Sequence, residues 1–188
     1  MNASIDITGV RLETARMVLR PWRAGDLADL YAYARVDGVG QMAGWLPHGS
    51  LEESREILDR FIREKKTFAL EHQGRVIGSI GVEVYDEGHY PELSGLSGRE
   101  IGYVLARDFW GRGLMPEAVR AVLRWLFDAQ GLDFVLVGHF DWNRQSARVI
   151  EKCGFRYVRT VPRETRCGTT EDLMEYILFH PGREADHG

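Results

Sequence analysis

Hydrophobic positions along this chain follow two spacings in turn, one typical of strands and one typical of amphipathic helices. In the first part the pattern predicts a strand over 17–22 and a helix over 26–35. A second helix begins at Ser50, which forms a capping box with Glu53, and its apolar positions keep helical spacing up to Ile62. The chain is therefore expected to open with one strand and two helices.

Two pairs of strands are predicted, one over 67–85 and one near the end of the chain. A hairpin is predicted over 67–71 and 76–85, turned at Gln73-Gly74. Near the end, a strand over 157–163 and a return strand over 173–179 have the apolar, β-branched and aromatic content of strands. These segments supply most of a sheet.

A glycine turn separates a strand from a helix in the centre of the chain. The apolar run Ile101–Ala106 predicts the strand, and apolar residues at helical spacing from Leu114 to Ala129 predict the helix. Between them lies Gly111-Arg112-Gly113, where glycines let the backbone approach a bulky anion and the helix start offers free N–H groups. An ordinary tight turn would explain the same glycines, but the segment lacks the marks of a P-loop or a dinucleotide fold.

A second helix start follows the next buried strand. The nearly unbroken apolar run over 133–140 predicts that strand. Asn143 then opens a short helix that ends at Cys153-Gly154, with the glycine in a C-cap position. The order of strand, glycine turn, long helix, strand and Asn-initiated helix strengthens the phosphate-site interpretation of the turn.

These segments together resemble the GNAT superfamily of N-acetyltransferases, and within it the ribosomal-protein N-acetyltransferase (RimJ/RimL-like) branch. The resemblance rests on LETARMVLRPWRAGDLADLYAY near the start, EIGYVLARDFWGRGLMPEAV in the middle and NRQSARVIEKCGF later. It implies an α/β (α+β) fold, with a single mixed, mostly antiparallel twisted sheet of about seven strands flanked by about four helices. We expect one domain over 1–188, with 1–11 and 181–188 as flexible ends.

The resemblance also implies which residues hold acetyl-CoA. The main chain of the strand would pair with the pantetheine arm like an added strand, and the turn would hold the pyrophosphate. Asp108 departs from the family pattern, which has Gln or Arg three residues before the first glycine. The expected cofactor-binding residues are Tyr103, Val104, Leu105, Ala106, Trp110, Gly111, Arg112, Gly113, Leu114, Met115, Asn143 and Ser146.

Acetyl transfer from a thioester to an amine requires removal of an amine proton, stabilisation of an oxyanion and departure of a thiolate. By resemblance Glu100 is the candidate base, and a solvated glutamate at a strand end is the alternative. Many relatives carry a tyrosine acid at the position that is Ile150 here, which excludes that acid. Ser146 matches the RimL-like serine near the CoA sulfur, although serine in a first helical turn also satisfies backbone groups.

Composition narrows the classes of partner. The net charge of −4 argues against a general nucleic-acid binder and is compatible with a cationic amine substrate. Cys153 and Cys167 form no metal-type pair, so no metal is expected. The start of the chain shows no leader pattern and no apolar run is long enough to cross a bilayer, so we expect a cytoplasmic protein without a membrane partner. Monomer and homodimer both stay open.

Two function classes follow from these features. The first is an acetyl-CoA-dependent N-acetyltransferase that acts on a primary amine, either a protein N-terminal amine or a small-molecule amine. The alternative is a non-catalytic acyl-CoA-binding sensor or regulatory module, which Ile150 and Asp108 keep open. The acceptor pocket is expected from 44–50, 86–98 and the region after Phe155, which are variable parts of such folds.

Overall fold

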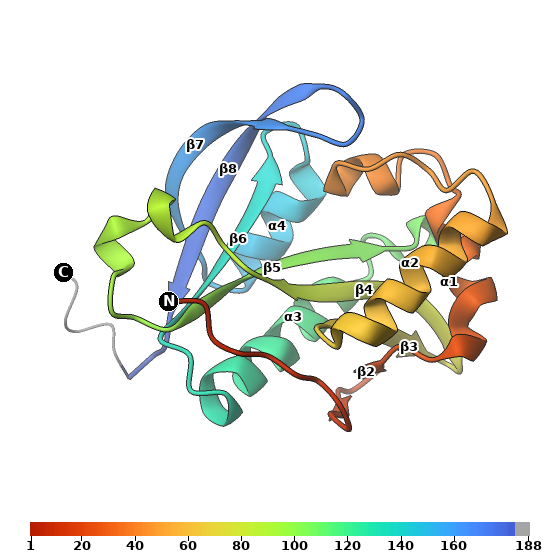
Figure 1. Ribbon diagram of the computed structural model, residues 1–188, viewed down its shortest axis with the longest axis horizontal. Helices are drawn as coiled ribbons and strands as arrows, with labels where there is room; N and C mark the ends of the chain where they lie inside the picture. The colour runs from red at the N-terminus through yellow and green to blue at the C-terminus, as the bar shows by residue number, and fades with distance from the viewer. Residues whose placement is uncertain (183–188) are drawn as a thin grey trace.

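One eight-stranded sheet carries the fold in the computed structural model, which describes residues 1–182 (Figure 1). The strand order is β1-β2-β3-β4-β5-β6-β8-β7, and every neighbouring pair is antiparallel except β5 and β6. The strands are β1 Leu12–Glu13, β2 Val18–Pro21, β3 Thr67–His72, β4 Arg75–Glu83, β5 Gly98–Leu105, β6 Phe134–Phe140, β7 Arg156–Glu164 and β8 Thr170–Phe179.

Helices cover both faces of this sheet. The α-helices are α1 Leu27–Ala34, α2 Leu51–Glu64, α3 Leu114–Arg124 and α4 Arg144–Lys152, and α3 continues as one π-helical turn over Trp125–Ala129. The helices α1 and α2 pack with Ala69 and Val76 on one face, whereas α3 and α4 pack with Leu19 and Phe68 on the other (Figure 1). Five short 3-10 turns, η1 Ala24–Asp26, η2 Gly40–Ala43, η3 Glu87–His89, η4 Pro91–Leu93 and η5 Arg107–Phe109, complete the described elements.

This architecture confirms the expected fold class, a mixed and mostly antiparallel sheet flanked by four helices. The one additional strand is β1, whose two residues are too short to leave a periodic pattern in the sequence. At the start of α2, the Ser50 Oγ accepts a hydrogen bond from the Glu53 N–H at 3.1 Å, as a capping box requires. The Glu53 carboxylate, however, accepts from the Gly49 N–H at 2.7 Å, one residue before the position expected for the box.

The start of the chain, for which a flexible end was expected, makes several contacts with the sheet. Asn2 forms a bridge with Gly98, and the Ala3 N–H donates to the Gly98 carbonyl at 3.2 Å. The side chain of Ile7 is 1% exposed and belongs to the main core. Burying this apolar side chain anchors the segment against the core. Of the other expected flexible end, 181–188, residues 183–188 lie outside the described part of the chain.

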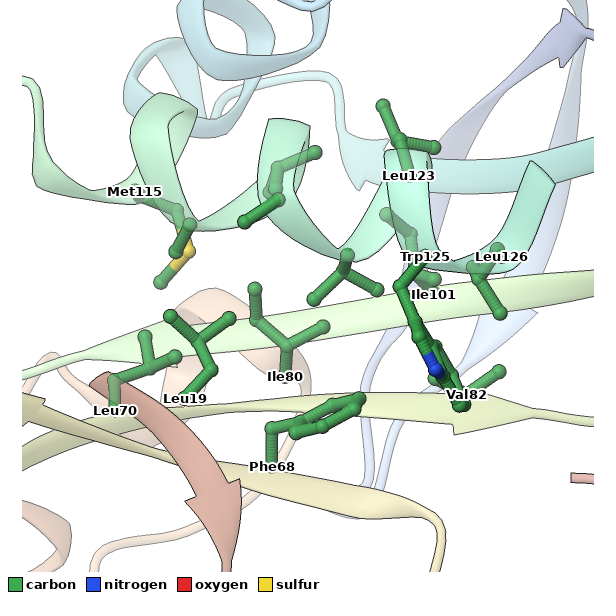
Figure 2. Packing of buried hydrophobic residues seen from close by; sticks show 14 of the residues in the cluster. Leu19, Phe68, Leu70, Ile80, Val82, Ile101, Met115, Leu123, Trp125 and Leu126 are labelled. Carbon is green, nitrogen blue, oxygen red and sulfur yellow. The ribbon is translucent and has the colours of Figure 1, made fainter. Parts of the chain in front are cut away.

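The main core lies between α3 and the strands β2 to β5 (Figure 2). The aromatic ring of Trp125 meets that of Phe68 edge to face, with centroids 5.4 Å apart. Each large side chain buried here contributes about 1.5–3 kcal/mol of transfer free energy. Those labelled in Figure 2 are Leu19, Phe68, Leu70, Ile80, Val82, Ile101, Met115, Leu123, Trp125 and Leu126. This packing fixes the start of α3 relative to β5, which positions the site described below.

The two parallel strands separate partway along their length (Figure 1). Their pairing runs from Gly98 opposite Phe134 to Ile101 opposite Val137 and then stops. Beyond that point β5 continues with β4 only, and β6 continues with β8 only. The edge of β5 over Gly102–Leu105 therefore has no strand partner on the β6 side, although it lies in the middle of the sheet.

Candidate active site

A cleft of about 750 Å³ opens where β5 and β6 separate. Its walls come from the β5 edge, the glycine turn, α4, the end of β6, η2 and the end of β7. Of the residues expected from the sequence, eleven line this cleft: Glu100, Tyr103, Val104, Leu105, Trp110, Gly111, Gly113, Leu114, Met115, Asn143 and Ser146. Ala106 and Arg112 are absent from the lining.

The free edge of β5 offers main-chain groups to an extended ligand. An unpaired strand edge binds such a ligand as an added strand, through its N–H and C=O groups. The indole N–H of Trp110 donates to the Leu105 carbonyl at 2.7 Å and so satisfies the last carbonyl of the edge. Trp110 thus bounds the open part of the edge in addition to lining the cleft.

The glycine turn is shaped for close approach of an anion. Gly111 and Gly113 have φ values of 73° and 74°, which only glycine adopts without strain. A Cβ atom at Gly111 would meet no heavy atom within 4 Å, so the space beside this backbone is open. Gly113 is the N-cap of α3, where free N–H groups and the helix dipole favour negative charge.

Two charged residues near the turn are absent from the lining of the cleft, Asp108 and Arg112. The Arg112 guanidinium lies over the ring of Phe109, 5.2 Å from its centroid, and Phe109 itself lines the cleft. Asp108 is exposed and is also absent from the lining. The acid that departs from the family pattern is therefore a solvent-exposed residue outside the cleft lining.

Asn143 holds the start of α4 next to η2. Its Oδ1 accepts a hydrogen bond from the Ser146 N–H at 3.1 Å, which makes it the N-cap of the helix. Its Nδ2 donates to the Met42 carbonyl at 3.1 Å. Both groups of this buried amide are thereby used within the chain, and they fix two walls of the cleft to each other.

Ser146 and Tyr103 form a hydroxyl pair at the cleft. Their oxygen atoms, Ser146 Oγ and Tyr103 Oη, lie 2.8 Å apart, and either can be the donor. Burial raises the pKa of Tyr103 and outweighs the hydrogen bond from Ser146, which lowers it, so the phenol keeps its proton at neutral pH. The sequence indicated only the main chain of Tyr103. Strand alternation could have revealed the side chain, since it places Tyr103 on the same face as Ile101 and Leu105, the face that packs against α3 and α4.

Glu100 lies on the opposite face of β5 and also lines the cleft. Burial is the main cause that raises the pKa of its carboxyl group, and the nearby carboxylates of Glu175 and Glu83 add to it. The Arg163 guanidinium acts in the other direction and lowers this pKa. Glu100 is therefore a carboxyl whose proton affinity is increased by its surroundings, the property that a general base needs near neutral pH.

The acceptor end of the cleft differs in part from the expected pocket. Gly44 lines it, and its carbonyl accepts a hydrogen bond from the Arg166 N–H at 2.9 Å, which joins the turn after β7 to η2. The expected segment 86–98 is absent from the lining. Its side chains Tyr90 and Leu93 pack in a separate cluster with Phe134.

Two other kinds of site are not found within residues 1–182. No group of three or more His, Cys, Asp or Glu side chains in this range could hold a metal ion. No helix in the same range is both long and apolar enough to cross a membrane.

Comparison with known proteins identifies the family. The model of the acetyltransferase (GNAT) domain matches residues 16–156, which is most of the chain. The uncharacterized protein YkkB of Bacillus subtilis (strain 168) is 26% identical over 162 residues, which cover 80% of this chain and 88% of YkkB.

Two solved structures share the fold over nearly their whole length. A GNAT-family acetyltransferase from Bacillus anthracis is 20% identical, with a TM-score of 0.78, and the match covers 91% of this chain and 99% of that one. A putative ribosomal-protein-serine acetyltransferase from Vibrio cholerae is 16% identical, with a TM-score of 0.75, and the match covers 93% of this chain and 99% of that one. With the family match, the open β5 edge and the glycine turn at α3 fit acetyl-CoA. The chain belongs to the GNAT acetyltransferase family and is an acetyl-CoA-dependent N-acetyltransferase.

Proposed function

We propose that the protein transfers the acetyl group directly to a primary amine in a ternary complex, with Glu100 as the base and Ser146 as the proton donor. The observation that carries this proposal is that both groups line the cleft, from opposite faces of β5: Glu100 lies on one face, just before the free edge begins, and Ser146 of α4 contacts Tyr103 on the other face. Acetyl-CoA, when bound, supplies the thioester. A base on one face and a proton donor on the other let the amine approach and the thiolate depart on different sides of that edge.

Glu100 would accept a proton from the incoming ammonium group. An alkyl amine has a pKa near about 10 and arrives charged at neutral pH, so it needs a base or a water chain. A partly buried carboxylate beside Glu175 and Glu83 attracts this cation, and its raised pKa makes it a better proton acceptor than a surface glutamate.

Ser146 would give a proton from its Oγ to the leaving sulfur, and Tyr103 would return one to Ser146 through their hydrogen bond. The second proton, which the amine nitrogen loses as the intermediate collapses to the amide, would restore the phenol through water. A serine hydroxyl alone is a weak acid. Ser146 Oγ lies 2.8 Å from the protonated phenol of Tyr103, which can donate a proton to Ser146 as Ser146 gives up its own. Replacement of the usual tyrosine by Ile150 therefore leaves a phenol available at the site, from β5 instead of α4.

Direct transfer is favoured over an acetyl-enzyme because neither cysteine lines the cleft. Burial also raises the pKa of the Cys153 thiol to about 11, which keeps it protonated and unreactive at neutral pH. A ping-pong mechanism through a cysteine therefore lacks a nucleophile in the right place.

Initial-rate kinetics test this proposal. Thiol release is measured while acetyl-CoA and an amine are both varied, for the wild type and for Glu100→Gln and Ser146→Ala. A ternary complex predicts intersecting double-reciprocal lines, and both variants should lose turnover while acetyl-CoA affinity changes little. Parallel lines, or normal turnover in either variant, would contradict the assigned roles.

A further inference from the structure

Basic side chains gather at the acceptor end of the cleft, close to Glu100. Arg163 at the end of β7 and Arg166 in the turn that follows both line the cleft. Their presence is notable because the chain as a whole carries a net charge of −4. The catalytic proposal uses neither of them.

Strand register places Arg163 on the same face of the sheet as Glu100. Arg163 pairs with Glu171 of β8, and Glu100 pairs with Leu136 of β6, which in turn pairs with Ile177 of β8. Positions 171 and 177 are an even number of residues apart along β8 and therefore share a face. The influence of Arg163 on the pKa of Glu100 agrees with this shared face.

Arg163 is only weakly engaged within the chain. Its Nη2 lies 3.6 Å from Glu175 Oε1, whereas Arg159 Nε approaches Glu175 Oε2 to 2.7 Å and Tyr90 donates to the same oxygen at 2.6 Å. Glu175 is thus satisfied mainly by Arg159 and Tyr90. The Arg163 side chain keeps 49% of its surface exposed and has donors free for a ligand.

Arg166 is less engaged still. Its main-chain N–H is tied to Gly44, which fixes the turn at the cleft, but none of residues 1–182 forms a hydrogen bond or ion pair with its guanidinium. Besides Glu100, one further carboxylate, that of Glu164, belongs to the lining. Alternation along β7 directs Glu164 to the face opposite Arg163, so it does not neutralise the arginine beside Glu100.

We propose that Arg163 and Arg166 bind an anionic group that the acceptor carries within a few bonds of its amine, as an amino acid carries its carboxylate. This inference rests on the proposed function. Guanidinium groups match carboxylate and phosphate oxygens with paired N–H donors, and Glu100 in the same cleft faces the amine. The acceptor is then a zwitterion, and an amine with a second positive charge is disfavoured by repulsion from the two arginines.

The test compares each of several amino acids with its own neutral amide, and O-phosphoethanolamine with ethanolamine. Two quantities are measured: kcat/KM for thiol release, and calorimetric affinity for the protein saturated with CoA, which lacks an acetyl group. We expect the anionic member of at least one pair to be favoured about 10-fold or more in both measurements, since charge-assisted hydrogen bonds have this strength. The amino-acid and phosphate pairs tell which anion is recognised.

Three variants assign the preference to the arginines. Arg166→Gln should reduce it to near parity, Arg166→Lys should keep part of it, and Arg75→Gln, at the far end of β4, should leave it unchanged. Equal use of acids and amides, or a preference for the amides that mimic a peptide N-terminus, would overturn the inference. If no amine is acetylated at all, the proposed function fails, and binding to the CoA complex still decides whether the anion site exists.

Discussion

The hydroxyl pair of Tyr103 and Ser146 gives the sharpest prediction about the chemistry. Tyr103→Phe removes one phenol oxygen, and with it the hydrogen bond of 2.8 Å to Ser146 Oγ. One hydrogen bond of this kind contributes about 0.5–1.5 kcal/mol. For a chain of this size we expect the melting temperature to fall by only a few degrees, at about 2–4 °C per kcal/mol.

The effect on turnover follows from the same hydrogen bond. If it is made in the transition state, its loss slows kcat by about 2- to 12-fold, at 1.36 kcal/mol for each factor of ten. Ser146→Ala should slow kcat by a larger factor, since it removes the group that meets the sulfur. Because Tyr103 acts only through Ser146, the double variant should be no slower than Ser146→Ala alone.

The assay is a double-mutant cycle of kcat with saturating acetyl-CoA and amine. Tyr157→Phe is a matched control, because the Tyr157 Oη also lies 2.9 Å from a hydroxyl, that of Thr160, but at an exposed position. It should leave kcat unchanged. Additive losses for Tyr103→Phe and Ser146→Ala would show that the two hydroxyls act independently, and the proposed relay would then be wrong.

Three further changes test other parts of the account. Gly113→Asp should weaken acetyl-CoA affinity, measured by titration, by at least about 10-fold, because a carboxylate would stand where the helix start favours an anion. The control Gly74→Asp, with a similar φ of 77° in the β3–β4 turn, should leave this affinity unchanged. Glu100→Gln should lower kcat by about 100-fold or more and abolish the acidic limb of the pH–rate profile. In the wild type this limb should lie above the ordinary pKa of glutamate, since burial raises the pKa of Glu100. A wild-type limb at or below the ordinary value would exclude Glu100 as the base. Asp26→Ala removes the carboxylate that Arg20 contacts at 2.8 and 2.9 Å, with side chains only 6% and 10% exposed, and leaves Glu71, at 2.6 Å, as its carboxylate partner. Chemical denaturation should show a loss of about 1.5–3 kcal/mol, against under about 1 kcal/mol for the exposed Glu13→Ala, and similar losses would contradict this difference.

The periodic and glycine-marked elements could be predicted well from the sequence. The hairpin turn falls at Gln73 and Gly74, both with positive φ, as the turn residues indicated. The Asn143 cap forms as expected, because capping is a local interaction between residues close in the chain. The glycine turn and the start of α4 both line the cleft, as expected, because the order of elements along the chain determines which strand ends lie together.

Features that depend on contacts between distant residues could not be predicted in the same way. The packing of Ile7 depends on a core built from β2 to β5 and α3, and no pattern within residues 1–11 reveals contacts with such distant elements. The side chain of Arg112 turns onto Phe109, and nothing in a Gly-Arg-Gly pattern distinguishes that arrangement from a phosphate contact. The meeting of Tyr103 with Ser146, 43 positions apart, depends on how far β5 and α4 approach each other.

The most direct test of acetyl transfer is thiol release from acetyl-CoA, measured with and without a panel of amino acids, amines and peptides. Release should rise with the concentration of at least one amine, and an equal amount of its N-acetylated product should form. Acetyl-CoA binding without amine-dependent release across the panel would contradict it, and would favour a protein that binds the cofactor without transferring the acetyl group.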